Sequence, residues 1–178
     1  MSLVDVFRAR VELVIKYLEI LETQPRQLKF TSADLLDPDT LSDLHDKFPR
    51  KSLNIYYIYH LSFDGEENSI ASRARTAFRS EREAKIWNLS RDNKQHLESS
   101  SLYVGSSECM HSRFRPHLGK GQGKTTWSLY LAKWAGSLNT KFILEYYELK
   151  DMSSEDVELV EGVLWDSFKP LFGKKGGR

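Results

Sequence analysis

The stretch that decides the fold is Ser101–Gly119, which reads SLYVGSSECMHSRFRPHLG. Its first residues are typical of a strand, Gly105 interrupts the pattern, and a helix is predicted shortly after it. Arg113 and His117 are four residues apart, so a helix would place them on one face. Because Tyr103 stands at the end of the strand, we expect its phenol, the guanidinium and the imidazole to lie near one another.

The composition predicts a soluble, cytoplasmic protein with one compact domain and an extension. The chain has 178 residues, of which 40% are hydrophobic, so it can bury a core of ordinary size. No apolar run approaches the roughly 20 residues of a membrane-spanning helix, and we expect no signal peptide and no membrane partner. The single Cys109 excludes an internal disulfide and a cysteine-based zinc site.

Charge is distributed unevenly along a chain whose net charge is only +1. The segment 109–144 contains six basic side chains and no acidic one. A polyanion-binding face would have this pattern, although a solvated basic surface would have it too. From this tract we predict nucleic-acid contacts for Arg115, Lys120 and Lys124. The glycine-rich sequence around the two lysines is one residue short of a Walker phosphate loop and follows a predicted helix, so nucleotide binding is not expected.

One acidic residue falls on the apolar face of the last long helix. Ser153 is followed three residues later by Asp156, as Ser2 is by Asp5, and this spacing predicts a capped start for each of the two helices. The apolar stripe that follows consists of Val157, Val160, Leu164 and Phe168. Glu161 lies within this stripe, and burying an ionised carboxylate without a partner costs several kcal/mol. We therefore expect a salt bridge, with Arg113 as one possible partner, a neutral acid of raised pKa, or a bound metal ion.

The remaining elements follow from periodicity and turn residues. Strands are predicted over 53–62, 102–105 and 141–149, because these runs are rich in β-branched and aromatic residues. Helices are predicted over 2–22, 38–48, 70–89 and 125–134 from the spacing of their apolar residues. Residues 1–50 would form a helical extension packed on a main domain of residues 51–178, which carries a helical insertion at about 66–99.

The spacing within the deciding stretch resembles that of the GIY-YIG nucleases. Tyr103-Val104-Gly105-Ser106 is similar to the family's Tyr-Ile-Gly followed by Ser. Arg113 and His117 stand ten and fourteen residues after that tyrosine, as in the family. On the preceding strand, Asn54-Ile55-Tyr56 resembles the family's Gly-Ile-Tyr, with Asn in place of Gly.

The resemblance continues near the end of the chain. Glu161 corresponds to the family's metal-binding glutamate, and Pro170 follows it at the family's spacing of nine residues. The family's Asn three residues after this proline is replaced by Gly173. The resemblance therefore implies an α/β fold with a small, three-stranded, mainly antiparallel sheet flanked by helices.

The function that the resemblance implies is metal-dependent hydrolysis of a phosphodiester bond in DNA. Glu161 would hold Mg²⁺ or Mn²⁺, and Arg113 would bind the scissile phosphate. Tyr56 would take the proton of the attacking water, with Tyr103 orienting the reactants and His117 assisting. The main alternative is a non-catalytic nucleic-acid-binding protein on the same fold. A purely structural domain would instead have these side chains scattered, roughly more than 10 Å apart.

Overall fold

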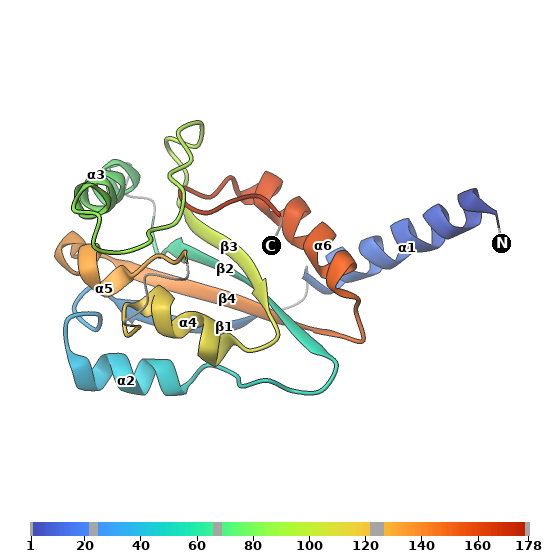
Figure 1. Ribbon diagram of the computed structural model, residues 1–178, viewed down its shortest axis with the longest axis horizontal. Coiled ribbons are helices and arrows are strands. Elements are labelled where there is room, and N and C mark those ends of the chain that lie inside the picture. Colours follow the sequence, from blue (N-terminus) through green and yellow to red (C-terminus); the bar gives the residue numbers. More distant parts are fainter. Residues whose placement is uncertain (1, 22–24, 66–68, 122–126, 177–178) are drawn as a thin grey trace.

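The centre of the molecule is an antiparallel β-sheet (Figure 1). The computed structural model describes residues 2–21, 25–65, 69–121 and 127–176. Within these residues the sheet has four strands in the order β1-β4-β2-β3, and each neighbouring pair is antiparallel. The strands are β1 (Arg26–Thr31), β2 (Ile55–Phe63), β3 (Ser101–Ser107) and β4 (Lys141–Lys150). The α/β class is confirmed, but the prediction of three strands is one short.

The strand that the sequence pattern did not predict is β1. It reads RQLKFT, in which only two side chains are apolar, and this is too few to give a clear alternation. It joins the sheet by pairing along β4, with Phe30 opposite Phe142 and their rings stacked at 5.1 Å. The first fifty residues therefore supply an edge strand as well as helices.

The helices lie close to their predicted positions. They are α1 (Leu3–Leu21), α2 (Pro38–Asp46), α3 (Ile70–Glu83), α4 (Met110–Leu118), α5 (Leu131–Trp134), the 3₁₀ turn η1 (Gly136–Leu138) and α6 (Ser154–Phe168). Hydrogen bonds cap the first turns of α1 and α6, as predicted. Asp5 N–H donates to Ser2 Oγ, and Asp156 N–H donates to Ser153 Oγ. By contrast, α3 ends six residues before its predicted end, and α5 begins only at Leu131, because residues 127–130 are not helical and Ser128 pairs with Leu89 in an isolated β-bridge.

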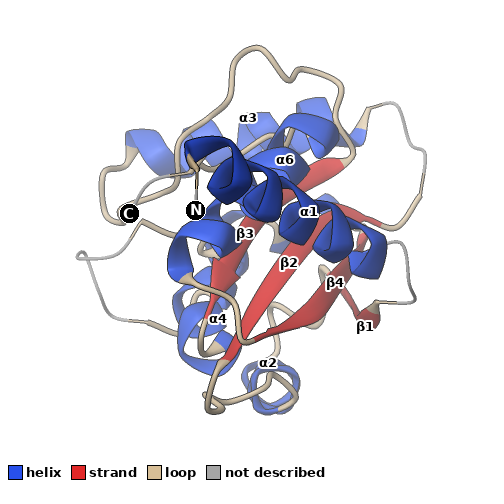
Figure 2. Cartoon of the chain, turned by 90° about the vertical axis from the view of Figure 1, so that its right-hand side faces the viewer, coloured by secondary structure: helices blue, strands red, loops and turns tan. Residues whose placement is uncertain are grey.

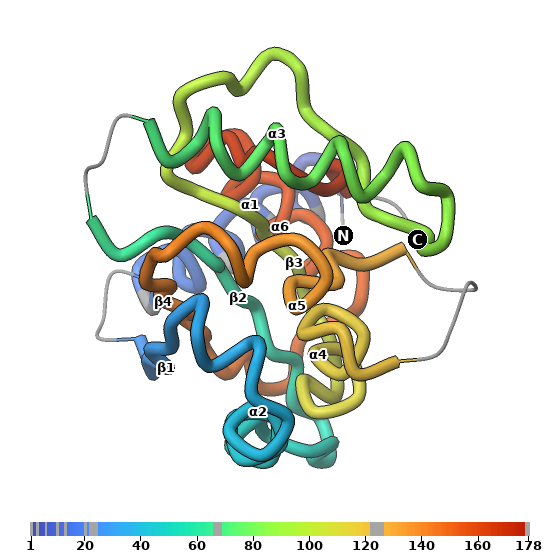
Figure 3. Tube along the Cα trace, turned by 90° about the vertical axis from the view of Figure 1, so that its left-hand side faces the viewer, coloured from blue at the N-terminus to red at the C-terminus, as the bar shows by residue number. Residues whose placement is uncertain are grey.

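Helices cover both faces of the sheet. On one face, α1 and α6 pack on β2 and β4 (Figure 2) through a small core that includes Val14, Ile58, Leu149 and Val160. On the other face, α2, α3, α4 and α5 enclose the larger core (Figure 3). Among the described residues, no helix combines the length and apolar character needed to cross a membrane.

The two halves of α1 differ in their surroundings. Val14 and Tyr17 are buried, and the Tyr17 hydroxyl donates to the Lys150 carbonyl. Towards its N-terminus the helix extends beyond the body of the domain (Figure 1), and there Val4 and Phe7 are largely exposed. The C-terminal half of this helix therefore packs on the sheet side of the molecule, and the N-terminal half does not.

Candidate active site

Two tyrosines from neighbouring strands meet one arginine. Tyr59 on β2 and Tyr103 on β3 lie with their rings nearly parallel, 6.2 Å apart. Arg113, on α4, donates from Nη2 to the Tyr103 hydroxyl at 3.1 Å and from Nε to the Tyr59 hydroxyl at 3.4 Å. Both phenol oxygens are thus held against a single guanidinium.

Gly105 makes this arrangement possible. It lies directly opposite Tyr59 in the pairing of β2 with β3, two residues after Tyr103. A Cβ at this position would lie 2.7 Å from the Tyr59 hydroxyl oxygen and 2.9 Å from Cε1 of Tyr103. Because glycine has no side chain, the Tyr59 ring can cross β3 and reach the arginine.

A second glycine borders the other edge of the Tyr103 ring. Gly173 adopts a φ of +108°, which favours glycine, and a Cβ here would lie 2.9 Å from Cε2 of Tyr103. Its amide donates to the Arg91 carbonyl. This packing leaves no room for the asparagine that the GIY-YIG pattern has at this position, so the departure from the pattern has a local steric reason.

Glu161 reaches the same region from α6. Its Oε2 accepts a hydrogen bond of 2.6 Å from the Ser106 hydroxyl, and Ser106 follows Gly105 on β3. The side chain is half-buried rather than enclosed by the apolar stripe. Glu158, one turn earlier on the same helix, also faces the cleft described next.

These groups share a cleft with a volume of about 1100 Å³. Tyr59, Tyr103, Arg113 and Glu161 all line it, together with the exposed Trp127. Its other basic side chains, among the described residues, are Lys51, Arg82, Arg91 and Lys174. The cleft therefore combines a half-buried guanidinium, the carboxylates of α6 on one wall, and exposed cations around them. Of these cations, Lys51 forms an ion pair with Glu108, which also lines the cleft.

Burial keeps the two phenols neutral. It raises the pKa of Tyr59 and of Tyr103, and the nearby positive charge of Arg113 offsets this only in part. The phenols, Tyr59 foremost, raise the pKa of Arg113 in turn, so the guanidinium stays charged. Each phenol oxygen accepts a hydrogen bond from the arginine. The hydroxyl proton of each tyrosine can therefore be donated to a group in the cleft.

His117 lies behind the tyrosines and does not line the cleft. Its side chain is completely buried, and its ring centre is 4.7 Å from that of Tyr103. The Leu129 amide donates to Nδ1 at 3.3 Å, which places the ring proton on Nε2. Burial, and then the charge of Arg113, hold the pKa of His117 well below its usual value, so the ring is neutral. Pro116 lies inside α4, where a proline commonly kinks or breaks a helix, but the helix continues past it to Leu118 and includes His117.

Tyr56 is not part of this group. Its hydroxyl donates to Oε1 of Glu108 at 2.9 Å, and its ring packs towards the core under α1 and α6. Tyr59, three residues later, occupies the place beside Arg113 that we expected for Tyr56. Tyrosines at 56, 57 and 59 all fit the strand pattern, and only the register against Gly105 distinguishes them.

Two of the three predicted nucleic-acid contacts lie elsewhere, and the third falls outside the described residues. Arg115 is exposed on α4, and Lys120 donates from Nζ to Ser42 Oγ. Neither lines the cleft, and Lys124 is outside the described residues. The exposed cleft cations come from four separate segments, and their convergence could not be inferred from local charge.

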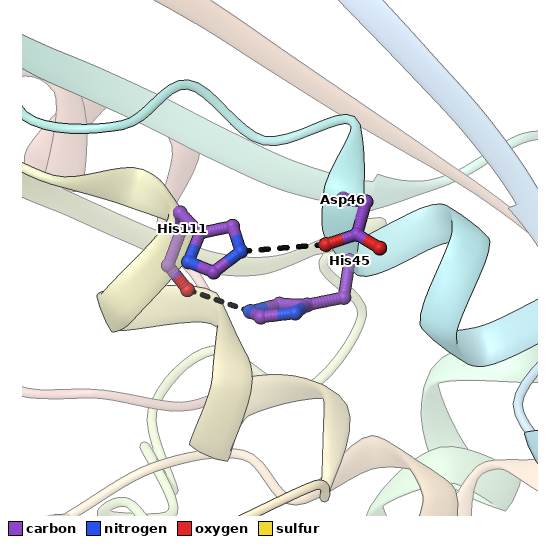
Figure 4. A group of neighbouring side chains, drawn as sticks. All are labelled: His45, Asp46 and His111. Atoms are coloured by element: carbon purple, nitrogen blue, oxygen red, sulfur yellow. Dashed lines mark hydrogen bonds and ion pairs between the residues drawn. The ribbon is translucent and has the colours of Figure 1, made fainter.

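A second polar cluster joins α2 to α4 (Figure 4). His45 donates from Nε2 to the His111 carbonyl at 2.8 Å, and Asp46 Oδ1 lies 3.5 Å from Nε2 of His111. The two imidazole centres are 4.0 Å apart, and the possible metal-ligating atoms of the three residues lie within 4.8 Å of one another. The tilted ring contact and the hydrogen bond to the carbonyl give this cluster a packing role between the helices.

Comparison with models of protein families, with curated proteins and with solved structures finds no match for the chain. The likeness to the GIY-YIG nucleases therefore depends on the residues and geometry described above.

Proposed function

We propose that this protein is a metal-dependent DNA endonuclease with a GIY-YIG-like site formed by Tyr59, Tyr103, Arg113 and Glu161. One observation carries the proposal: the Arg113 guanidinium donates hydrogen bonds to two phenols, in a basic cleft that also contains the Glu161 carboxylate. Electropositive clefts of this kind attract and orient a phosphate backbone.

Arg113 would hold the scissile phosphate. Two of its bonds go to the phenols, which leaves further N–H donors of the five on a guanidinium. A planar, permanently charged donor stabilises the additional negative charge of a pentacovalent phosphate. The tyrosine bonds fix the orientation of this donor before the substrate arrives.

Tyr59 would move the proton of the attacking water. A neutral phenol with a raised pKa is a poor base. A proton relay through Tyr59 is therefore favoured over a phenolate that is present before the reaction begins. In this relay the Tyr59 oxygen accepts the water proton while its own proton passes to a phosphate oxygen. Tyr103 would orient the phosphate through its hydroxyl, and His117 would act as a positioning residue behind both rings.

Glu161 suits a hard divalent cation such as Mg²⁺ or Mn²⁺. Its carboxylate lines the cleft and accepts a hydrogen bond from the Ser106 hydroxyl, and Mg²⁺ commonly uses one or two carboxylates with water and phosphate as its other ligands. When bound there, the ion would neutralise charge on the leaving oxygen. Ser106 would hold the carboxylate in the orientation that the ion requires.

The test is cleavage of supercoiled plasmid in Mg²⁺, with EDTA as the control. We expect Glu161→Gln to lose cleavage and to retain DNA affinity, measured by fluorescence anisotropy. Glu158→Gln, one turn away, is the matched control and should cut. Cleavage by Glu161→Gln at the wild-type rate would contradict the assignment.

The alternative of a non-catalytic nucleic-acid-binding protein is favoured by one observation. Both phenols have raised pKa values, and this disfavours proton abstraction. The same experiment separates the two functions, because the alternative predicts that the wild-type protein binds DNA in Mg²⁺ and leaves it uncut.

A further inference from the structure

The N-terminal helix α1 presents an apolar stripe to solvent. Val4, Phe7, Val11 and Ile15 are 64%, 69%, 41% and 50% exposed. Their spacing places them on one face of the helix, beside the buried Val14. The half of the helix that carries Val4 and Phe7 projects from the domain (Figure 1).

Such a helix is poorly stabilised by itself. Isolated helices shorter than about 12–15 residues are marginal in water, and most helical stability in proteins comes from packing an apolar face. A contiguous exposed stripe of large apolar residues is also a common mark of an interaction surface. A partner on this stripe would cover the apolar residues and support the projecting turns together.

The spacing of the stripe is symmetric. Adding the half-buried Leu18 gives the residues Val4, Phe7, Val11, Ile15 and Leu18, with successive separations of three, four, four and three. This sequence of separations reads the same in both directions. If two such helices pair antiparallel, Val11 meets its own copy, Phe7 meets Ile15, and Val4 meets Leu18. A dyad through Val11 therefore brings every member of the stripe onto another, as an isologous two-fold interface requires.

The flanking charges select the antiparallel arrangement. Asp5, Arg8, Glu12 and Lys16 are exposed and lie on the side of the stripe away from Val14, with Arg8 and Glu12 nearest to it. With the dyad at Val11 and a rise of about 1.5 Å per residue, Arg8 lies about 3 Å along the axis from Glu12 of the second copy. Asp5 likewise lies about 1.5 Å from the level of Lys16 of the second copy. In a parallel pair the two charged borders would lie on opposite sides of the interface, so these opposite charges would not meet.

We propose that this face of α1 binds α1 of a second copy of the chain, antiparallel and with Val11 on the dyad. The proposal does not depend on the nuclease function, and it would place two clefts in one particle. Each helix is about 28 Å long, so the helix pair buries less than a standard interface. The dimer should therefore be weak and dependent on concentration.

Sedimentation velocity over a range of concentrations tests the association. We expect a monomer–dimer equilibrium for the wild-type chain and at least tenfold weaker association for Phe7→Glu, with the helix content checked by circular dichroism. Leu97→Glu is the matched control, because Leu97 is 62% exposed on a different surface. A wild-type monomer at all concentrations, or a dimer that Phe7→Glu leaves intact, would overturn the proposal.

Cross-linking tests the register and direction. In a Cys109→Ser background, a short bismaleimide should join Val11→Cys to its own copy. Phe7→Cys should not join to itself, but it should join when mixed with Ile15→Cys. Efficient self-cross-linking of Phe7→Cys would indicate a parallel pair and contradict the dyad at Val11.

Discussion

Replacing Gly105 by alanine perturbs the site by a single methyl group. The new Cβ would lie 2.7 Å and 2.8 Å from Oη and Cζ of Tyr59, and 2.9 Å from Cε1 of Tyr103. Ordinary van der Waals contact begins at 3.4 Å, so the rings must retreat by about 0.5 to 0.7 Å. Both tyrosines are buried, so the rings have little room to retreat without disturbing their contacts with Arg113.

Two effects of this substitution can be measured separately. Overpacking of this kind costs about 1–3 kcal/mol of unfolding free energy, which urea denaturation would detect. Displacing catalytic groups by a fraction of an ångström should reduce the single-turnover rate of DNA cleavage roughly 10- to 100-fold. Both losses arise from the same displaced rings, so they should appear together.

Two comparisons isolate the cause. In a Tyr59→Phe background the nearest clashing atom is absent, so Gly105→Ala should cost less stability there, which a double-mutant cycle measures. Gly162→Ala, on α6, is the control, because its nearest contact would be Lys175 Cε at 3.9 Å. This control should fold normally. A Gly105→Ala variant as stable and as active as the wild type would refute the reasoning.

Two further predictions concern single side chains. Tyr59→Phe should reduce cleavage strongly, whereas Tyr56→Phe should leave it nearly unchanged; the reverse order in a plasmid assay would restore Tyr56 as the proton acceptor. His117 should make the fold less stable in acid. Its folded pKa is below the unfolded value of about 6.5, so the unfolded chain binds more protons and stability is lost as the pH falls below about 6.5, by up to about 1.4 kcal/mol per pH unit. His117→Gln should reduce this slope in urea unfolding between pH 7.5 and 5.5, although burial also lowers the pKa values of His45 and His60 and preserves part of it. An unchanged slope would contradict a neutral buried His117.

Sequence patterns predicted those helices and strands that are determined by residues close together in the chain. The bonds of Ser2 with Asp5 and of Ser153 with Asp156 follow from side chains three residues apart. The alternation of β-branched and aromatic residues similarly predicted β2 and β4. Short polar strands lack this signal, and β1 is a strand only because β4 supplies its hydrogen bonds.

The site was predictable only in part, because its geometry depends on register. The strand-then-helix pattern of residues 101–119 predicted that Arg113 lies near Tyr103, and the apolar stripe of α6 drew attention to Glu161. Which tyrosine of β2 reaches the arginine depends on which residue faces Gly105, and the sequence does not encode that pairing locally. The cations of the cleft converge from distant segments for the same reason.

The most direct test of the account is the cleavage rate of the Arg113→Lys variant. Lysine keeps the charge but lacks the planar fork that bonds two phenols and a phosphate at once. Arg115→Lys, on the exposed side of the same helix, is the matched control. We predict that the wild-type protein and Arg115→Lys cut DNA in Mg²⁺, and that Arg113→Lys cuts at least 100-fold more slowly while binding DNA and remaining folded. Equal cleavage by Arg113→Lys and the wild type would contradict the proposed site.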